Sequence, residues 1–531
     1  MGRRIICAIL ILSLGLSLFY VGYRTDDPLY GGTSAEETTV PDENAVVEDE
    51  NTLTLWYTDD ALTDYLTAEA LSYQSQTGIK VNPVLVSGVE YLEHINSASL
   101  TPESERRELP PDVYITTHDT LLRAYLSNLA VKVSDAEEFL NEEYYPKTAL
   151  NAVTCYGDYV GYPLYYETNY FLYNKTYMAS IAQNRIESEA DALEGEAATE
   201  ELENSDETPE NSEILDISED KENEEPEEAA DEGEAGDEEG DPMGSEDSDI
   251  SEEALERLAT MIPATLDDIT TFANNYDAPE AVESVFEWDV TDIFYNYFFV
   301  GNYMEVGGED GDNTAVFNIY NQQAVDCLSV YQSMNQFFSI DADEVSYDKI
   351  LDDFIQGKTV FTVATTDAIA KIEEAKAKGE FDFDFGVTYL PDISTLLKAR
   401  GLSVTTAAAV NGYSDRIEMA SDFARFLTVE KSQELYKKAG KIACRSDVQY
   451  DNEEIGNIMA EYEKSVPLPK MVEAINYWVQ LEIAFTKIWN GADPDETLKE
   501  LSDTIGGQIE EIKLSLPTQD SFLAGGGKLI N

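Results

Sequence analysis

The strongest constraint on the fold is a regular alternation of strand and helix patterns near the start of the chain. The run TLTLWY (52–57) predicts a strand, a helical spacing of apolar residues follows until Gly78, and IKVNPVLV (79–86) predicts a second strand. A further helical pattern (91–99) leads to a third predicted strand, DVYITT (112–117). Strands that alternate with helices form open, mostly parallel α/β sheets, in which ligands collect at the carboxyl ends of the strands.

Two local patterns predict elements later in the chain. Thr265 is placed to cap a helix that continues over 269–276. The Asp–Gly step in GGEDGDNTAVFN (307–318) predicts a hairpin turn between polar and β-prone residues. The acids of this turn do not form an EF-hand calcium loop, because no Glu occupies the twelfth position.

The first 24 residues (1–24) have the layout of an export signal, in which Arg3 and Arg4 precede an apolar run from Ile5 to Val21. The run is long for a cleaved signal peptide and short for a membrane span, so both a signal peptide and an uncleaved N-terminal anchor stay open. In either case the rest of the chain is exported and faces the outside of the cell. Residues 25–51 are expected to form a disordered tether.

A strongly acidic segment, 186–256, carries 33 of the 107 acidic residues, one basic residue (Lys221) and no aromatic residue. Low hydrophobicity with high net charge cannot offset chain entropy, so we expect a disordered insertion. It could be a solvated insertion that the fold tolerates, or an element that binds cations or a basic partner. The whole chain has a formal net charge of −74, which excludes nucleic acid as a partner because phosphates would be repelled.

Known catalytic and metal-binding patterns are missing. The chain has only two histidines, and the cysteines beyond the leader (Cys155, Cys327 and Cys444) have no CxxC spacing. We therefore expect no metal site, no cofactor and three buried thiols. No GxSxG, HExxH or GxxxxGK(S/T) motif is present, so we expect no catalytic residues and a protein that is not an enzyme. A glycan-degrading enzyme with paired carboxylates stays open as an alternative, because so many acids form close pairs by chance.

Several longer runs form an ordered set of motifs. They are PPDVYITTHDTLLRAYLSNLAVKVSD, YGDYVGYPLYYETNYFLYNKTYM, PATLDDITTFANN, AVFNIYNQQAVDCLSVYQSM, FIQGKTVFTV, FGVTYLP, IEMASDFARFLTVEKSQELYKKAGKIACRSDV and WNGADPDETLKELSDTI. In this order they resemble the extracellular solute-binding proteins of ABC importers, in particular the maltose-binding-protein-like group. The resemblance spans about 52–512 apart from the acidic insertion.

The resemblance implies an α/β, periplasmic-binding-protein-like fold of type II, with two lobes, a hinge and a central cleft. The first lobe would contain 52–165 and 392–446, and the second would contain 166–391 and 447–531 with the acidic insertion inside it. Such a protein is expected to be a monomer. It would bind a small-molecule ligand in the cleft and deliver it to ABC permease subunits in the membrane.

The resemblance also implies eight ligand contacts: Asp59, Asp60, His118, Asp119, Glu167, Trp288, Asp367 and Trp478. The first four follow the first and third predicted strands, where relatives place polar ligand contacts. Asp119 matches a carboxylate that binds sugar hydroxyls, and Trp478 resembles a tryptophan that stacks on sugar. Each could instead be structural, as a helix cap, a solvated acid or a core aromatic residue. Thr116 and Asp367 stand where sugar binders usually carry aromatic residues.

Aromatic residues with carboxylates suit a carbohydrate, so we expect the ligand to be a sugar. A polyamine is an alternative, because the acids could attract its cationic charge. A degenerate member of the family that binds a protein partner as a sensor or scaffold is another, and a cation-buffering surface protein is a third.

Overall fold

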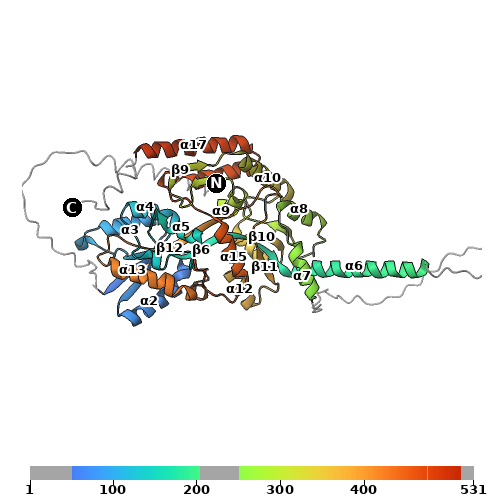
Figure 1. Cartoon of the computed structure of the whole chain (residues 1–531), viewed down its shortest axis with the longest axis horizontal. Coiled ribbons are helices and arrows are strands. Elements are labelled where there is room, and N and C mark those ends of the chain that lie inside the picture. Colours follow the sequence, from blue (N-terminus) through green and yellow to red (C-terminus); the bar gives the residue numbers. More distant parts are fainter. Residues whose placement is uncertain (1–50, 204–249, 475, 516–531) are drawn as a thin grey trace, which may run out of the picture. The chain divides into compact units, whose positions relative to one another are not determined.

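The computed structural model describes residues 51–203, 250–474 and 476–515 (Figure 1). The predicted leader and nearly all of the predicted tether lie outside these ranges, and no described helix is long and apolar enough to cross a membrane. The chain divides into two compact units. In the smaller one, which comprises Met1–Val47 and Pro102–Arg107, the 3-10 turn Glu103–Glu105 is described. Everything that follows concerns the larger unit.

The strands of the larger unit are β1 (Thr52–Tyr57), β2 (Lys80–Leu85), β3 (Val113–Thr117), β4 (Thr154–Cys155), β5 (Asp158–Tyr159), β6 (Tyr162–Asn174), β7 (Ser284–Glu287), β8 (Glu305–Gly307), β9 (Asn313–Asn318), β10 (Thr359–Thr365), β11 (Phe385–Thr388), β12 (Leu402–Val410) and β13 (Val466–Pro467). The α-helices are α2 (Thr63–Thr77), α3 (Tyr91–Leu100), α4 (Leu121–Leu126), α5 (Lys147–Val153), α6 (Lys175–Glu203), α7 (Glu252–Met261), α8 (Leu266–Asn275), α9 (Ile293–Asn296), α10 (Gln322–Phe338), α11 (Tyr347–Ile355), α12 (Ala368–Lys378), α13 (Ile417–Arg425), α14 (Leu435–Ala439), α15 (Glu454–Lys464), α16 (Tyr477–Trp489) and α17 (Pro494–Ser515).

The main sheet runs in the order β2-β1-β3-β12-β6-β10-β7, with β11 paired to β6 and β13 to β12. Strand β1 is parallel to both β2 and β3, as the alternating pattern predicts. Strand β6 pairs antiparallel with β12 through its first part and with β10 through its last part. It therefore links the two halves of the sheet (Figure 1). The predicted lobe boundary between residues 165 and 166 falls inside this strand.

Local sequence signals account for many of the element ends. Helix α2 ends at Gly78, whose φ of 76° is the left-handed conformation that a C-cap glycine adopts without strain. Helix α8 starts at Thr265 with a complete capping box to Asp268. The predicted hairpin is present as β8 and β9, and Gly307 at its turn has a φ of 82°. These three predictions are confirmed.

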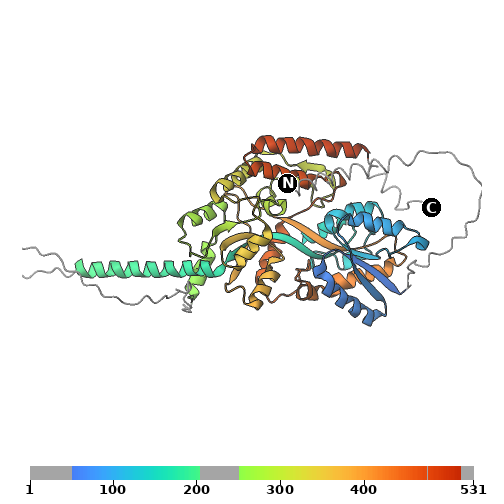
Figure 2. The same ribbon diagram turned by 180° about the vertical axis from the view of Figure 1, so that it is seen from behind.

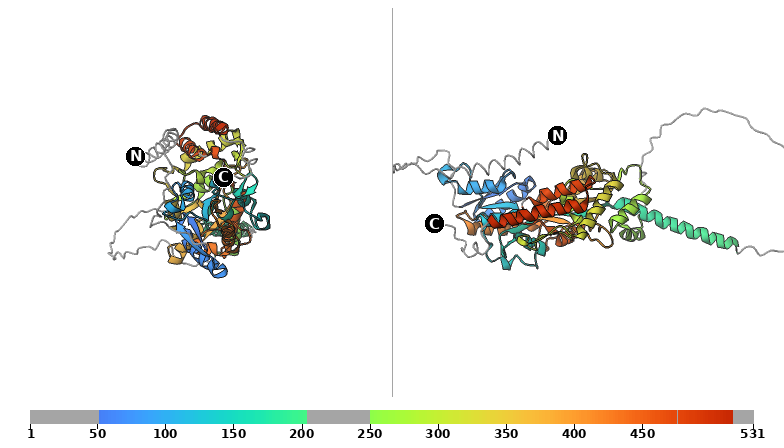
Figure 3. Two further views of the ribbon diagram at one scale, coloured as in Figure 1. Left: turned by 90° about the vertical axis from the view of Figure 1, so that its left-hand side faces the viewer. Right: turned by 90° about the horizontal axis from the view of Figure 1, so that it is seen from above.

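The buried core forms two large clusters and one smaller cluster. One large cluster packs around β10, α10 and α16, and α17 lies along α16 (Figure 3). The other packs on β1, β3 and β12, and it also takes in Ile369 and Ile372 of α12 and Tyr462 of α15. Since both helices belong to segments assigned to the second lobe, side-chain packing crosses the predicted division. The thiols of Cys155, Cys327 and Cys444 are free and buried, as expected.

The expectation of disorder over 186–256 is wrong at both ends of that segment. Helix α6 continues to Glu203, and Ser251 caps α7 by accepting a hydrogen bond from the Ala254 N–H. Ala254 is fully buried in the core, and the Ser251 hydroxyl donates to the Gln183 side chain at 2.8 Å. The first turns of α6 therefore lie beside α7 (Figure 2). Residues 204–249 of the segment lie outside the described residues.

Candidate functional site

One lysine connects two carboxylates that come from different strands. Lys441, in the loop after α14, has its Nζ 2.9 Å from Asp59 Oδ2 and 3.4 Å from Glu167 Oε1. Asp59 follows β1 and caps the short 3-10 turn Asp60–Leu62, whereas Glu167 lies on β6. Tyr165, two residues before Glu167, donates its hydroxyl to Asp59 Oδ2 at 3.2 Å. We call Asp59, Tyr165, Glu167 and Lys441 the lysine cluster.

Electrostatics keep the lysine cluster charged. Burial lowers the pKa of Lys441, but Tyr165, Glu167 and Asp59 outweigh this effect and raise the pKa above its ordinary value. Burial raises the pKa of Asp59, but its interactions with Lys441 and its hydrogen bond from the Ala61 N–H leave that pKa lowered overall. The cluster therefore keeps the Lys441 ammonium beside the Asp59 carboxylate at neutral pH. The acids keep lone pairs that can accept further hydrogen bonds.

A second polar group lies on the α9, α11 and α12 side of the sheet. Asp367, at the start of α12, accepts a hydrogen bond from the Tyr347 hydroxyl at 2.7 Å and pairs with Lys371 Nζ at 2.8 Å. The ring of Tyr347 stacks on that of Tyr295, with centroids 4.8 Å apart and an interplanar angle of 21°. We call Tyr295, Tyr347, Asp367 and Lys371 the tyrosine cluster.

Tyr295 is the residue that relates the two clusters. Burial raises the pKa of its hydroxyl, and the negative charges of Asp367, Asp292 and other acids raise it further. Glu167 of the lysine cluster is among those acids. A carboxylate of β6 in the lysine cluster therefore acts electrostatically on a residue of the tyrosine cluster.

His118 is fully buried, and both of its ring nitrogens are hydrogen-bonded. Nδ1 accepts the Thr405 N–H at 3.0 Å, so Nε2 carries the proton that it shares with the Leu468 carbonyl at 3.0 Å. Burial, with the charge of Lys470, lowers the pKa of His118 to about 4, although Asp119 opposes this shift. The neutral ring thus joins the end of β3 to β12 and to the segment after β13.

The next residue, Asp119, differs from His118. Its Oδ1 is buried and has no hydrogen-bond partner among the described residues. A buried acceptor without a partner costs about 1–3 kcal/mol, so it marks a place where a ligand or water could donate a hydrogen bond. Asp60, by contrast, is exposed in the first turn after β1.

The two candidate tryptophans also differ. Trp288 is fully buried, with its Nε1 donating to Asn296 Oδ1 at 2.9 Å and its ring 4.8 Å from Phe286. Trp478, at the start of α16, is only partly buried and lies edge-on to Tyr297 at 5.3 Å. In this arrangement neither Trp288 nor His118 presents a free polar atom to a ligand. Trp478 keeps part of its surface accessible.

The predicted contacts therefore fall into three sets. Asp59, Glu167 and Asp367 lie in the two clusters, Asp60, Asp119 and Trp478 keep unused surface or polar atoms, and His118 and Trp288 support the fold around them. None of the eight lines the described pockets of about 530, 510 and 600 Å³, although Lys371 of the tyrosine cluster lines the last of these. The described part of the chain has no group of three or more side chains placed to hold a metal ion.

Sequence reasoning missed five residues of the clusters: Tyr165, Tyr295, Tyr347, Lys371 and Lys441. Two of them had local signals. Tyr165 is two residues from Glu167 on one strand, and therefore on the same face of the sheet. Lys371 is four residues after Asp367 on one helix, the spacing of an ion pair. Lys441 and the two remaining tyrosines come from distant segments, and no local pattern marks them.

Comparisons with known proteins agree with this architecture. A family model of bacterial extracellular solute-binding proteins matches residues 70–457. No curated protein matches the chain.

Several solved structures are similar to the chain. The extracellular solute-binding protein from Staphylococcus aureus in complex with maltose is 19% identical, and the match covers 89% of this chain and all of that chain with a TM-score of 0.61. A cyclo/maltodextrin-binding protein with maltotetraose is 17% identical, with 87% and 98% covered and the same TM-score. The maltose-binding periplasmic protein from Listeria monocytogenes with maltose is 16% identical, with 87% and 98% covered and a TM-score of 0.59. At these identities the likeness shows the fold, and the two-lobed α/β architecture of type II is confirmed.

Proposed function

The chain belongs to the bacterial extracellular solute-binding proteins, and from this membership we propose that it binds a carbohydrate between its lobes and delivers it to the permease of an ABC importer. The observation that carries the proposal is the pair of polar clusters, each of which sets a lysine beside carboxylates. The lysine cluster supplies charged acceptors and a donor, and the tyrosine cluster supplies a further carboxylate with a second lysine.

These groups match the chemistry of a sugar. Hydroxyls donate to the carboxylates of Asp59, Glu167 and Asp367, and they accept hydrogen bonds from Lys441 and Lys371. The partly exposed ring of Trp478 offers a flat apolar face to the C–H face of a sugar ring. The unpartnered Asp119 Oδ1 would gain a hydrogen bond from a ligand hydroxyl, which removes the cost of leaving it unmet.

The ion pairs favour a neutral sugar over a polyamine. A polyamine needs carboxylates whose charge is not already compensated. Lys441 offsets one of the two charges of Asp59 and Glu167, and Lys371 offsets that of Asp367, so one net negative charge remains. A polyamine with several cationic groups would have to displace a lysine to pair all of them, whereas a hydroxyl can bind beside the lysines.

The proposal has a mechanical consequence. A ligand that contacts both clusters binds the closed arrangement of the lobes more tightly than an open one, and it shifts the population toward the closed form. A permease that recognises the closed form then receives only loaded protein. The fold of the family supports this role without any catalytic step.

Calorimetric titration tests the proposal with glucose, maltose and maltotetraose on one side, and putrescine and spermidine on the other. We expect saturable binding of at least one sugar and a stabilisation of about 2.7 kcal/mol at a hundredfold excess over Kd. Glu167→Gln should weaken sugar binding about tenfold or more, because it removes a charged acceptor. Glu374→Gln, at an exposed position of α12, is the control and should bind normally.

Other outcomes identify the alternatives. Binding of spermidine without any sugar response would replace the carbohydrate assignment with a polyamine. Release of shorter sugars from an incubated oligosaccharide would indicate an enzyme. No response to any small molecule would favour a sensor or scaffold that binds a protein.

A further inference from the structure

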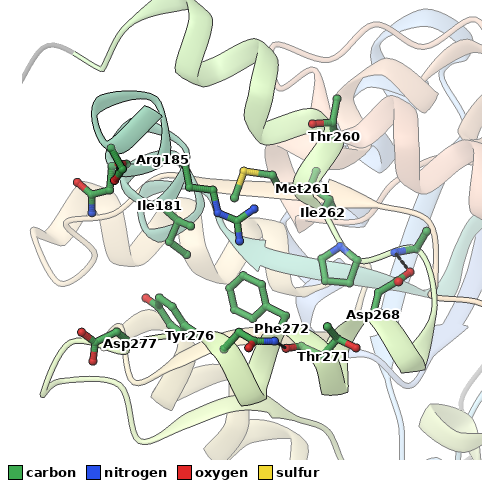
Figure 4. A pocket seen from close by; sticks show the side chains of 15 residues that line it. Ile181, Arg185, Thr260, Met261, Ile262, Asp268, Thr271, Phe272, Tyr276 and Asp277 are labelled. Atoms are coloured by element: carbon green, nitrogen blue, oxygen red, sulfur yellow. Dashed lines mark hydrogen bonds between the residues drawn. The ribbon is translucent and has the colours of Figure 1, made fainter. Parts of the chain in front are cut away.

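A pocket of about 530 Å³ lies where α6, α7 and α8 meet, and it shares no residue with the two clusters (Figure 4). This volume is within the range of small-molecule sites, about 300–1,000 Å³. About half of its lining is apolar and comes from Ile181 of α6, Met261 at the end of α7, Ile262 and Pro263 in the connection, and Phe272 of α8. The pocket is built in part from the helices that frame the acidic insertion.

Arg185 of α6 extends its guanidinium into this pocket, between Met261 and Ile262 on one side and Phe272 on the other (Figure 4). The side chain makes no hydrogen bond or ion pair with another described residue. A guanidinium has five N–H donors in a planar fork, so the pocket contains a complete set of unused donors.

The nearest acids are already engaged. Glu189, one turn further along α6, forms a two-point ion pair with Arg257 of α7. Asp268 accepts hydrogen bonds from both the backbone N–H and the hydroxyl of Thr265. The hydrogen bond from Arg257, with a smaller contribution from the charge of Arg185, lowers the pKa of Glu189. The carboxylates of Glu189 and Asp268 are thus paired with other groups, and neither hydrogen-bonds to Arg185.

A second donor and a flat surface lie in the same pocket. The rings of Phe272 and Tyr276 are 5.0 Å apart, and both line the wall. Burial raises the pKa of Tyr276 to about 12, so its hydroxyl keeps its proton at neutral pH. No described residue accepts a hydrogen bond from that hydroxyl.

From this geometry we infer a second ligand site, which takes a small molecule with one carboxylate and a compact apolar body. The planar fork of Arg185 pairs with both oxygens of a carboxylate, the strongest arrangement that such a group can form. The body then lies against Met261, Ile262 and the face of Phe272. A free organic acid and the carboxyl terminus of a short peptide share this chemistry.

The large negative charge of the chain does not prevent such binding. At physiological salt, charges beyond about 8 Å are largely screened, so only the nearest groups act on the ligand. Of the acids that line the pocket, Asp268 is occupied as a cap and Asp277 stays on the rim (Figure 4).

The test titrates the full chain with 4-phenylbutyrate, 4-phenylbutanol and 4-phenylbutylamine, which share one body and differ in the head group. We expect saturable binding of the acid only. Acetyl-Leu-Phe with a free carboxylate, compared with its amide, then distinguishes a peptide terminus from a free acid as the source. Equal binding of all three head groups, or no saturable binding of any carboxylate, would overturn the inference.

Three variants test whether the acid binds in this pocket. Arg185→Gln should weaken binding of the acid about ten- to a hundredfold, the loss expected for charged hydrogen bonds. Thr271→Trp places a large side chain in the pocket from an exposed position of α8 and should abolish binding without entering the core. Arg123→Gln, which alters a partly exposed arginine far away in sequence on α4, is the matched control and should bind normally. Unchanged binding in Arg185→Gln would also overturn the inference, whatever sugar titrations show for the lobes.

Discussion

Lys441 and Asp59 form an ion pair of 2.9 Å between a loop late in the chain and the turn after its first strand. Glu167 of β6 shares the same lysine at 3.4 Å. The three side chains come from segments that are far apart in the sequence, and no local pattern links these segments. The pair is partly shielded from water, since the lysine side chain is only 14% exposed.

Replacing Lys441 by Met should destabilise the protein by about 1–3 kcal/mol, because two half-buried carboxylates then lack their cation. The same change should raise the pKa of Asp59. A carboxyl whose folded pKa is lowered contributes stability above its unfolded pKa, and this contribution is lost as pH falls through the folded value. The variant should therefore lose less stability than wild type between about pH 5 and pH 3. Urea unfolding at several pH values measures both effects, with Lys378→Met at an exposed helix pair as the control.

Glu461→Gln should stabilise the protein at pH 8 by about 1–3 kcal/mol. Burial raises the pKa of this carboxyl to about 7, even though Lys464 and the Leu390 N–H oppose the shift. A carboxyl with a raised folded pKa destabilises progressively as pH rises from about 4 to about 7. In the variant this decrease of the free energy of unfolding with rising pH should be absent. A difference in the free energy of unfolding between variant and wild type that stays constant across this pH range would contradict the prediction.

His118 changes the stability of the protein in the opposite direction to Glu461 over an overlapping pH range. Its folded pKa of about 4 lies below the ordinary histidine value of about 6.5, so stability falls as pH drops between these values. The Glu461 effect must therefore be read as the difference between variant and wild type. His118→Asn should remove the histidine slope, and it should also cost stability by disrupting the bonds to Thr405 and Leu468.

Two linker replacements separate the helical ends of the acidic segment from its middle. A short Gly/Ser linker in place of 204–249 should leave the thermal midpoint nearly unchanged, because loop closure depends weakly on length. A linker in place of 186–256 should lower the midpoint clearly, since it removes the Ser251 cap and the buried Ala254. Equal midpoints would mean that α7 contributes nothing to the fold.

Tryptophan fluorescence should report sugar binding through Trp478, since the other three tryptophans are almost fully buried. If stacking dominates, Trp478→Ala should weaken binding more than Asp119→Ala does. The reverse order would mean that recognition of hydroxyls by carboxylates dominates. A sugar that binds by calorimetry and leaves the fluorescence of wild type unchanged would remove Trp478 from the site.

Cell fractionation tests the leader, which lies outside the described residues. We expect part or all of the protein to stay with the membrane through the apolar run 5–21, because no lipidation cysteine and no clean cleavage site follow it. Mature protein that begins after the run and is free in the medium would show that the run is a cleaved signal peptide.

The sequence by itself determined several helices and strands and their order, because the pattern that predicts each of them lies within a short stretch of neighbouring residues. Apolar spacing predicted β1, α2 and β2. Thr265 marked the start of α8 because its hydroxyl accepts a hydrogen bond from a backbone N–H, and Gly78 marked the end of α2 because glycine adopts the left-handed conformation without strain. Composition singled out the acidic segment but overestimated the disorder of its two ends. Residues with good helix propensity continue α6, and burial of Ala254 holds α7.

The tertiary structure alone decided the site. The antiparallel pairing of β6 and β12 brings distant segments together. This arrangement buries His118 and places Lys441 beside Asp59. The same is true of Arg185. Arg257 of α7 pairs with Glu189, so this carboxylate does not bind the donors of Arg185. Such contacts join residues that are distant in sequence. They are set by the path of the whole chain, so no local pattern encodes them.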